Sequence, residues 1–273
     1  MLKVACAQLQ PEFGSVEKNV EMVCRAIREA AGTGAQLVVL PELATTGYMF
    51  TDREEAHSLS EEIPGGPSSQ RILETAKDLG VCAVVGVAER DGGRLFNTAC
   101  VFGPDGFVGH FRKVHLWDRE NVLFEPGDLG FPVFNTPIGR IATFICYDGW
   151  FPESYRSCVL AGADLICIPT NWVPIPGQGH HAQAMATILC MASAHSNSVV
   201  VAAADRVGVE RGQPFIGQSL IVSHTGWPVA GPASAESQEI IYADVDLAAA
   251  RSDRAWNAFN NPIRDRRPES YQQ

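Results

Sequence analysis

The chain has 273 residues, 46% of them hydrophobic and 19% charged, and its formal net charge is −10 at pH 7. This composition is typical of an ordered globular protein, and the absence of a linker-like tract predicts one domain over residues 1–273. The acidic balance argues against nucleic acid as a partner, and the lack of an apolar run of about 18 residues argues against a membrane span.

Hydrophobic patterning in the first half of the chain predicts strands that alternate with helices. The N-terminus lacks a signal-peptide pattern and enters a strand directly. The expected elements are a strand over 3–8, a helix over 16–31, a strand over 36–40, a helix over 68–79, a strand over 81–88, and strands over 97–102 and 106–112. Gly103-Pro104-Asp105-Gly106 between the last two strands is a strong hairpin signal.

The second half continues this pattern after a loop over 117–130. The expected elements are strands over 132–136 and 140–145, a helix over 152–161, a strand over 164–168, a helix over 180–197, strands over 199–204, 217–223 and 239–245, and a short helix after Asp246. Because strands alternate with helices but also form hairpins, the sequence favours mixed sheets covered by helices over a purely parallel sheet.

The cysteine pattern argues against a metal or a cofactor. Eight cysteines are scattered through apolar segments, at positions 6, 24, 82, 100, 146, 158, 167 and 190, and none forms a Cys-x-x-Cys pair. Buried reduced thiols in a cytoplasmic protein explain this usage. His180 and His181 do not suggest a metal, because adjacent helical residues diverge by about 100° and no third ligand is evident.

Cys146 is the first candidate for chemistry, because it lies where a buried strand ends. The apolar segment 140–145 precedes it, and Pro152 is placed to begin a helix shortly after. Backbone N–H groups at a helix start favour a thiolate and any oxyanion formed beside it. A structural buried cysteine explains the position equally well, so the decision depends on other residues.

Two other polar side chains also follow strands. Glu42 comes after Leu40 and Pro41, and Lys113 comes after the strand over 106–112. A carboxylate near a thiol can accept its proton, and a nearby ammonium can stabilise an oxyanion. Each residue alone is more simply interpreted as a solvated strand end, so only their combination with Cys146 indicates a catalytic site.

Three ordered segments with these residues resemble the Glu-Lys-Cys signature of the nitrilase superfamily of carbon–nitrogen hydrolases. They are Pro41-Glu42, Arg112-Lys113-Val114-His115-Leu116 and Cys146-Tyr147-Asp148-Gly149-Trp150-Phe151-Pro152-Glu153. The similarity extends over essentially the whole chain and includes Phe124-Glu125-Pro126-Gly127, Asp205-Arg206 with Gly208 and Gly217, and Asp265-Arg266-Arg267-Pro268. The chain is most similar to the small single-domain aliphatic nitrilase and amidase type.

The resemblance implies a fold and a set of roles. The fold is α/β, a four-layer α-β-β-α sandwich of two mixed sheets. Cys146 would be the nucleophile, Glu42 the general base and later the general acid, and Lys113 would stabilise the tetrahedral intermediate together with the Tyr147 backbone N–H. Glu120 matches a second carboxylate that positions the substrate amide in amidases of this family.

The same resemblance implies a cofactor-free hydrolase that cleaves a small aliphatic amide to a carboxylic acid and ammonia through a Cys146 thioester. Relatives that bind carboxylate-bearing substrates place arginine where this chain has Gly149 and Trp150. A neutral or apolar acyl group is therefore expected, although Trp150 also resembles N-carbamoylputrescine hydrolases. Residues that could wall an aromatic pocket are Tyr48, Phe50, Trp117, Trp150, Asn171 and Trp172.

Several alternatives remain open from the sequence. A nitrilase would act through the same cysteine and cannot be separated from an amidase by sequence. A Cys-His-Asp hydrolase would need a late histidine, for which His224 is the only candidate beyond residue 195, and a non-catalytic binding subunit would not require all three residue types. The resemblance also implies a homodimer or higher homo-oligomer, formed by the helix near 152–161 and a C-terminal tail over about 256–273.

Overall fold

The computed structural model describes residues 1–175 and 183–271, and in these residues two six-stranded β-sheets pack face to face. The first sheet has the order β14-β1-β2-β3-β4-β5. Its strands are β1 (Leu2–Gln8), β2 (Leu37–Val39), β3 (Cys82–Asp91), β4 (Arg94–Gly103), β5 (Gly106–Arg112) and β14 (Glu239–Val245). Parallel pairing of β1 with β2 and of β2 with β3 is combined with antiparallel pairing at both sides, so the sheet is mixed.

The second sheet has the order β13-β12-β9-β8-β7-β6. Its strands are β6 (Val133–Thr136), β7 (Gly139–Thr143), β8 (Leu165–Pro169), β9 (Val200–Ala204), β12 (Leu220–Val222) and β13 (Pro228–Ala230). The central strands β7, β8 and β9 are parallel, and β6 and β12 pair with them antiparallel. A separate two-stranded ribbon joins β10 (Val209–Glu210) and β11 (Gln213–Pro214).

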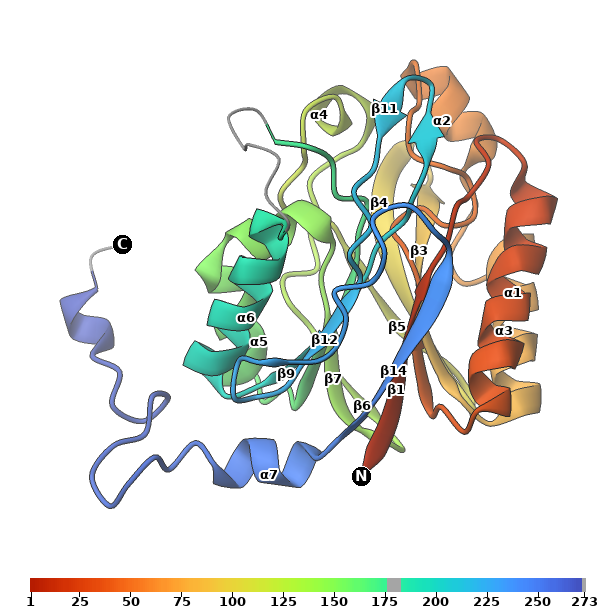
Figure 1. Ribbon diagram of the computed structural model, residues 1–273. Coiled ribbons are helices and arrows are strands. Elements are labelled where there is room, and N and C mark those ends of the chain that lie inside the picture. Colours follow the sequence, from red (N-terminus) through yellow and green to blue (C-terminus); the bar gives the residue numbers. More distant parts are fainter. Residues whose placement is uncertain (176–182, 272–273) are drawn as a thin grey trace.

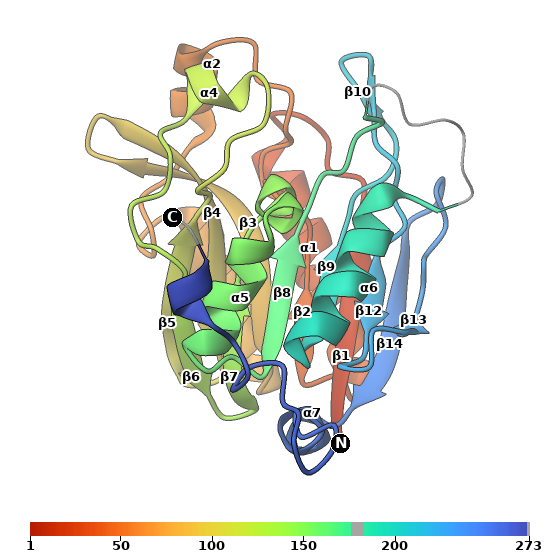
Figure 2. The same ribbon diagram turned by 90° about the vertical axis from the view of Figure 1, so that its left-hand side faces the viewer.

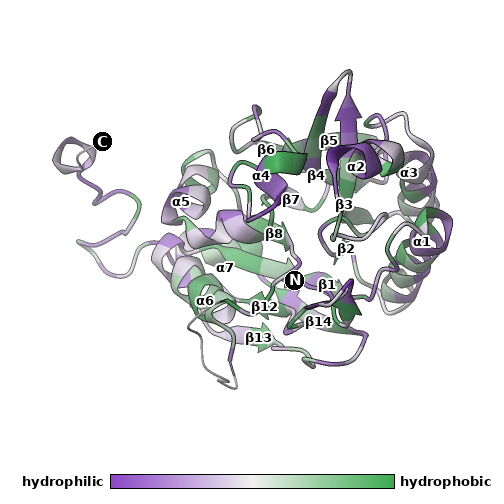
Figure 3. Cartoon of the chain, turned by 90° about the horizontal axis from the view of Figure 1, so that it is seen from above, coloured by the Kyte–Doolittle hydropathy of each residue, from purple (hydrophilic) through white to green (hydrophobic). Residues whose placement is uncertain are grey.

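Helices cover the outer faces of both sheets. α1 (Val16–Gly32) and α3 (Pro67–Leu79) lie on the first sheet, and α5 (Pro152–Leu160) and α6 (Met185–Asn197) lie on the second (Figures 1 and 3). The α-β-β-α sandwich that the resemblance implied is therefore confirmed.

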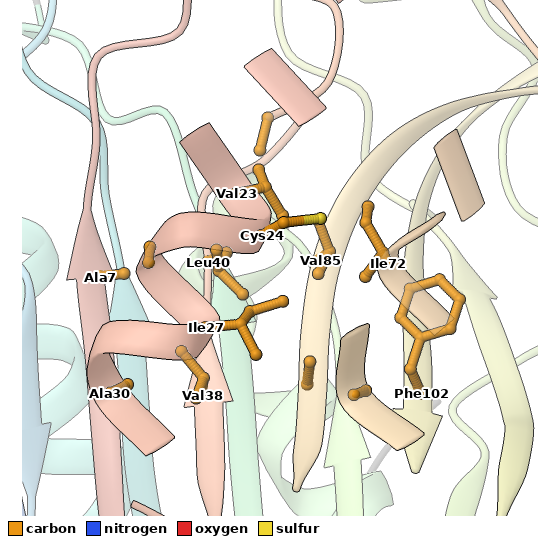
Figure 4. Close-up of a cluster of buried hydrophobic side chains, with 14 of the residues drawn as sticks. Ala7, Val23, Cys24, Ile27, Ala30, Val38, Leu40, Ile72, Val85 and Phe102 are labelled. Atoms are coloured by element: carbon orange, nitrogen blue, oxygen red, sulfur yellow. The ribbon is translucent and has the colours of Figure 1, made fainter. Parts of the chain in front are cut away.

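The alternation of side chains along β1 explains the layers. Val4 and Cys6 point into the core between the two sheets, whereas Ala5 and Ala7 point toward α1 and α3. On the helix side, Val23 and Ile27 of α1 pack against strand residues such as Val38, Leu40 and Val85 (Figure 4). Each fully buried valine or isoleucine contributes about 1.5–3 kcal/mol through removal of apolar surface from water.

Some short elements were not predicted. α2 (Arg53–Leu59) begins where the Asp52 side chain accepts a hydrogen bond from the Glu55 N–H, and α4 (Glu120–Leu123) lies in the segment expected to be a loop. Both are too short to show apolar periodicity. The strand expected over 217–223 is shorter because Gly217 and Gln218 have positive φ angles, and β13 was missed. In the described residues α6 begins at Met185, later than expected.

The chain leaves the sandwich after β14. α7 (Leu247–Ser252) is followed by an irregular tail that lies outside α5 and α6, with one 3₁₀ turn at Pro268–Ser270 (Figures 1 and 2). The tail contacts these helices, since Ile263 packs against the core cluster beneath them and Arg156 Nη1 donates to the Pro262 carbonyl at 3.5 Å. Within residues 1–175 and 183–271, no helix has the length and apolarity needed to cross a bilayer.

Candidate active site

The predicted catalytic residues follow strands that end at the same edge of the two sheets. Glu42 follows β2, Lys113 follows β5, and Cys146 follows β7, whose neighbour β8 leads to Asn171. β8 points toward the end of the molecule where α2 and α4 lie (Figure 2). The Asn171 Nδ2 donates to the Glu42 carbonyl at 2.9 Å, which joins the two sheets at this edge.

Glu42 is fully buried in a tight turn against β3. The turn approaches β3 so closely that a Cβ on Gly86 would lie 2.5 Å from the Glu42 Cα. The Gly86 N–H donates to the Pro41 carbonyl, and the Gly86 carbonyl accepts from Ala44, so glycine is needed at this position. The Glu42 side chain is thereby directed by backbone contacts on rigid strands.

Lys113 lies between two carboxylates. Its Nζ is 2.6 Å from Glu42 Oε1 and 2.7 Å from Glu120 Oε1, and all three side chains are buried. Asn97 Nδ2 also donates to Glu42 Oε1, at 2.7 Å. Burial by itself lowers the pKa of Lys113, but the charges of Glu120 and Glu42 outweigh burial and hold the pKa above its usual value. Lys113 is therefore a fixed positive charge.

Glu120 is held in place by the first turn of α4. Its Oε2 accepts a hydrogen bond from the Trp117 N–H at 2.9 Å, while its Oε1 contacts Lys113. The Lys113 carbonyl accepts from Gly127, where a Cβ would lie only 1.9 Å from the Arg112 carbonyl oxygen. The segment 117–127 thus packs closely over Lys113 and supplies Glu120, the second carboxylate beside it.

Cys146 begins a 3₁₀ turn over Cys146–Trp150, with a left-handed φ of +46° that is strained for a side chain. The buried Asp148 holds this turn: its Oδ2 accepts from the Ile145 N–H at 3.0 Å, and its Oδ1 contacts the His115 backbone N–H at 2.9 Å and the His115 Nδ1 at 2.7 Å. Asp148 therefore connects the cysteine turn to the segment that carries Lys113.

The ionisation of the site differs from the sequence expectation for Cys146. Burial and the negative charge of Glu42 raise the pKa of the Cys146 thiol well above its usual value, although Lys113 opposes them. This direction is opposite to the expected preference for a thiolate, because desolvation and the Glu42 charge outweigh the groups that lower the pKa, which are Lys113, Thr170 and the Asn171 backbone. Burial raises the pKa of Glu42 to about 7, against the opposing charge of Lys113. Oε2 of Glu42 is buried and has no hydrogen-bond partner among the described residues.

A pocket of about 270 Å³ opens onto Cys146. It contains four of the predicted wall residues and is lined by Trp117, Cys146, Tyr147, Trp150, Asn171, Trp172, Val173 and Ile175. The ring of Tyr147 lies edge-on to that of Trp117, with centroids 4.9 Å apart. None of these lining residues is charged.

Tyr48 and Phe50 do not line this pocket. They line a neighbouring hollow with Trp117 and Glu120, and Phe50 also packs edge-on against Phe124. Burial of the phenol raises the pKa of Tyr48, and the negative charges of Glu120 and Glu42 raise it further. Phe50 is 2% exposed and belongs to a small hydrophobic core.

Asn97 and Asp148 are site residues that the sequence reasoning missed. Asn97 is a buried polar residue within β4. A polar residue inside an apolar strand pattern needs a hydrogen-bond partner, and this pattern in the sequence could have indicated it.

Of the histidines considered from the sequence as a base or as metal ligands, the structure describes His224. His224 contacts Asp253 after α7 at 2.9 Å, so its partner is not a residue of the Cys146 pocket. His180 and His181 lie outside the described residues. Within residues 1–175 and 183–271, no group of three side chains that could hold a metal ion is found.

Comparison with known proteins gives the family. The model of the carbon–nitrogen hydrolase family matches residues 3–255. The chain belongs to this family. It is 44% identical over 272 residues to a nitrilase from Pyrococcus abyssi, covering 99% of both chains. It is 33% identical over 287 residues to an N-carbamoylputrescine amidase from Arabidopsis thaliana, covering 99% of this chain and 92% of the relative.

Comparison with solved structures gives the same family. A carbon–nitrogen hydrolase from Helicobacter pylori G27 superposes with a TM-score of 0.88 at 27% identity, covering 99% of this chain and 96% of the other. The resemblance to the nitrilase superfamily is therefore confirmed, and the protein is an enzyme that hydrolyses carbon–nitrogen bonds. The relatives differ in their named substrates, so the family alone does not give the substrate of this hydrolase.

Proposed function

We propose that this hydrolase cleaves a small, neutral aliphatic amide to a carboxylic acid and ammonia through a Cys146 thioester. The observation that supports this proposal is the pocket at Cys146, whose lining among the described residues is aromatic and aliphatic apart from Cys146 and Asn171 and includes no charged side chain. A carboxylate-bearing acyl group would lose its hydration there without gaining a cationic partner. An apolar acyl group gains from contact with the pocket wall.

In the proposed first step, Glu42 accepts the Cys146 proton while the sulfur attacks the amide carbon. The raised pKa of Cys146 means that a neutral thiol binds the substrate, and a carboxylate with a pKa of about 7 can take up its proton near neutral pH. The tetrahedral oxyanion would be stabilised by the Lys113 ammonium and the Tyr147 backbone N–H. Glu120 would orient the amide NH2 from the other side of Lys113.

In the second step, protonated Glu42 returns its proton to the leaving nitrogen, the carbon–nitrogen bond breaks, and ammonia departs from the thioester. A water molecule then loses a proton to Glu42 and attacks the thioester carbon. The carbon–sulfur bond breaks, the acid is released, and Glu42 returns the proton to the departing sulfur, which regenerates the thiol. One carboxyl group serves as base and acid in turn, which requires the intermediate pKa that burial gives to Glu42.

Two other substrates fit the same catalytic residues. A nitrile would add the thiol across its C≡N bond, and the nitrilase relative at 44% identity supports this alternative. An N-carbamoylated amine is supported by the relative at 33% identity and by the aromatic rings of Trp117, Tyr147 and Trp150, which could hold an alkylammonium group through cation–π contacts.

Matched substrates distinguish these alternatives. The purified enzyme is incubated with amides, nitriles and N-carbamoyl amines that share each acyl or alkyl group, and ammonia release is measured. We expect the highest kcat/KM for a neutral aliphatic amide, with its ω-carboxylated analogue slower by at least about 10²-fold, because burying an unpaired charge costs several kcal/mol. Nitrile turnover without amide turnover would reject the proposal.

We also propose that the enzyme is a homo-oligomer in which α5 and the tail over 256–273 contact a second subunit. The tail lies outside α5 and α6 and exposes large apolar side chains, with Trp256 54% and Phe259 84% exposed. Leu160 at the end of α5 is also 48% exposed. Apolar surface of this kind is typical of a buried interface. Equilibrium sedimentation is expected to give a multiple of 29.5 kDa, and a purely 29.5 kDa species would refute the assembly.

A further inference from the structure

Asp205 and Arg206 follow β9 and have no role in the chemistry above, yet both are buried. Asp205 is 0% and Arg206 1% exposed. A buried carboxyl and a buried guanidinium are costly unless they are bound by specific partners. Their partners lie on two different segments that line the Cys146 pocket and the neighbouring hollow.

Asp205 holds the wall of the Cys146 pocket. Its Oδ1 accepts a hydrogen bond from the Trp172 backbone N–H at 2.8 Å, and its own N–H donates to Ser219 Oγ at 2.8 Å. Burial raises the pKa of Asp205 well above its usual value, although the N–H groups of Trp172 and Arg206 and the Arg206 charge oppose burial. Trp172 lines the pocket, and Asn171 beside it contacts the Glu42 carbonyl.

Arg206 extends in the other direction, toward Tyr48. Its Nη1 is 2.7 Å from Glu210 Oε2, its Nη2 donates to the Pro11 carbonyl at 2.9 Å, and its guanidinium lies over the Phe215 ring at 4.2 Å. The second oxygen of Glu210 accepts from the backbone N–H groups of Tyr48 and Met49, both at 2.7 Å.

We infer that Asp205 and the Arg206–Glu210 pair are positioning residues that set the width of the substrate site, and therefore the acyl chain length that the enzyme prefers. The hydrogen bond from Trp172 to Asp205 fixes Trp172 at the Cys146 pocket. The contacts from Arg206 through Glu210 fix Tyr48 in the adjoining hollow beside Glu120. Asp205 and Arg206 are consecutive residues at the end of β9, so Trp172 and Tyr48 are held at a constant separation. This inference rests on the proposed function.

The experiment compares Asp205→Ala with the conservative Asp205→Asn. Asparagine retains an oxygen that can accept from the Trp172 N–H, whereas alanine removes the acceptor. Kinetics are measured on straight-chain amides of two to six carbons. A wild-type pocket discriminates between homologues that differ by one methylene by about tenfold. We expect Asp205→Ala to reduce this ratio by at least about threefold and to raise KM more than it lowers kcat, because the wall is no longer fixed.

Alkylation of Cys146 by iodoacetamide is measured in parallel. We expect the alkylation rate of Asp205→Ala to remain within about threefold of wild type, because none of the atoms that act on the sulfur is removed. Asp205→Asn should retain the wild-type chain-length preference. An unchanged chain-length preference in Asp205→Ala would overturn the inference, and so would an equal loss of preference in Asp205→Asn. A fall in the Cys146 alkylation rate that parallels the loss of preference would also overturn it.

A second variant covers the case in which Asp205→Ala does not fold. Glu210→Asp retains the charge opposite Arg206, but its shorter side chain cannot reach both Arg206 and the Tyr48 and Met49 N–H groups. Glu210→Asp should reduce the chain-length preference by loosening Tyr48, and an unchanged preference would overturn the inference. If wild type hydrolyses nitriles but not amides, the proposed function fails, and the same comparison on a nitrile series still decides the inference.

Discussion

Glu42→Gln is expected to lower kcat for amide hydrolysis by about 10²–10⁴-fold, the range associated with a single general acid–base residue. Glutamine preserves the shape of the side chain and can still accept from Asn97, but it cannot take the proton of a thiol whose pKa is raised by burial. Ammonia release under saturating amide gives kcat. The folded state is checked by thermal unfolding, since the substitution also removes one negative charge beside Lys113.

The control is His224→Ala, which removes the only late histidine that a Cys-His-Asp hydrolase could use as its base. Its Nε2 contacts Asp253, outside the Cys146 pocket, so this variant should keep wild-type activity. An inactive His224→Ala enzyme together with an active Glu42→Gln enzyme would reverse the assignment of the base.

The wild-type pH profile follows from the same carboxyl group. Burial raises the pKa of Glu42 to about 7, and only its deprotonated form can act as the base. In wild type, kcat/KM should therefore fall as the pH drops through about 7. Above this pKa it should be constant until the thiol or the lysine titrates at higher pH. An acid limb near pH 4.5, the ordinary value for a glutamate, would contradict a buried base.

Lys113→Met is expected to give the second large effect, on both activity and stability. The substitution leaves the carboxyl groups of Glu42 and Glu120 buried without the ammonium that lies 2.6 and 2.7 Å from them. Removing one partner from a buried ion pair typically costs about 3–5 kcal/mol. Loss of an oxyanion-stabilising group lowers kcat by a further factor of about 10²–10³.

The destabilisation of Lys113→Met should depend on pH in a defined direction. Without the cation, the folded-state pKa of the carboxyl pair lies above its unfolded value, so protonation relieves the penalty. Urea unfolding should therefore show a small deficit near pH 5 that grows toward pH 8. Lys77→Met, on the exposed face of α3, is the matched control and should leave both stability and activity unchanged. A deficit in Lys113→Met that does not vary with pH would contradict the charge argument.

Much of the fold could be predicted from local pattern. The helix at 16–31 is an observed helix over Val16–Gly32 because apolar residues recur at its period, and β1 and β5 were predicted within one residue. α2 and α4 were missed because a helix of one or two turns depends on caps and packing more than on periodicity. The candidate residues Glu42, Lys113 and Cys146 were found because a polar side chain directly after a buried strand is a local signal.

The chain by itself determined the family, the strand ends and the identities of the three residues proposed for the chemistry, because these depend on short-range pattern and on motifs that can be read in order. The tertiary structure decided what local pattern cannot contain. It directed Asn97 and Lys113 onto the same Glu42 oxygen and placed Glu120 against the Lys113 ammonium. It also raised the pKa of the Cys146 thiol, although the sequence suggested a thiolate. Burial in a low-dielectric interior sets these ionisation states, and burial is a property of residues distant in the chain.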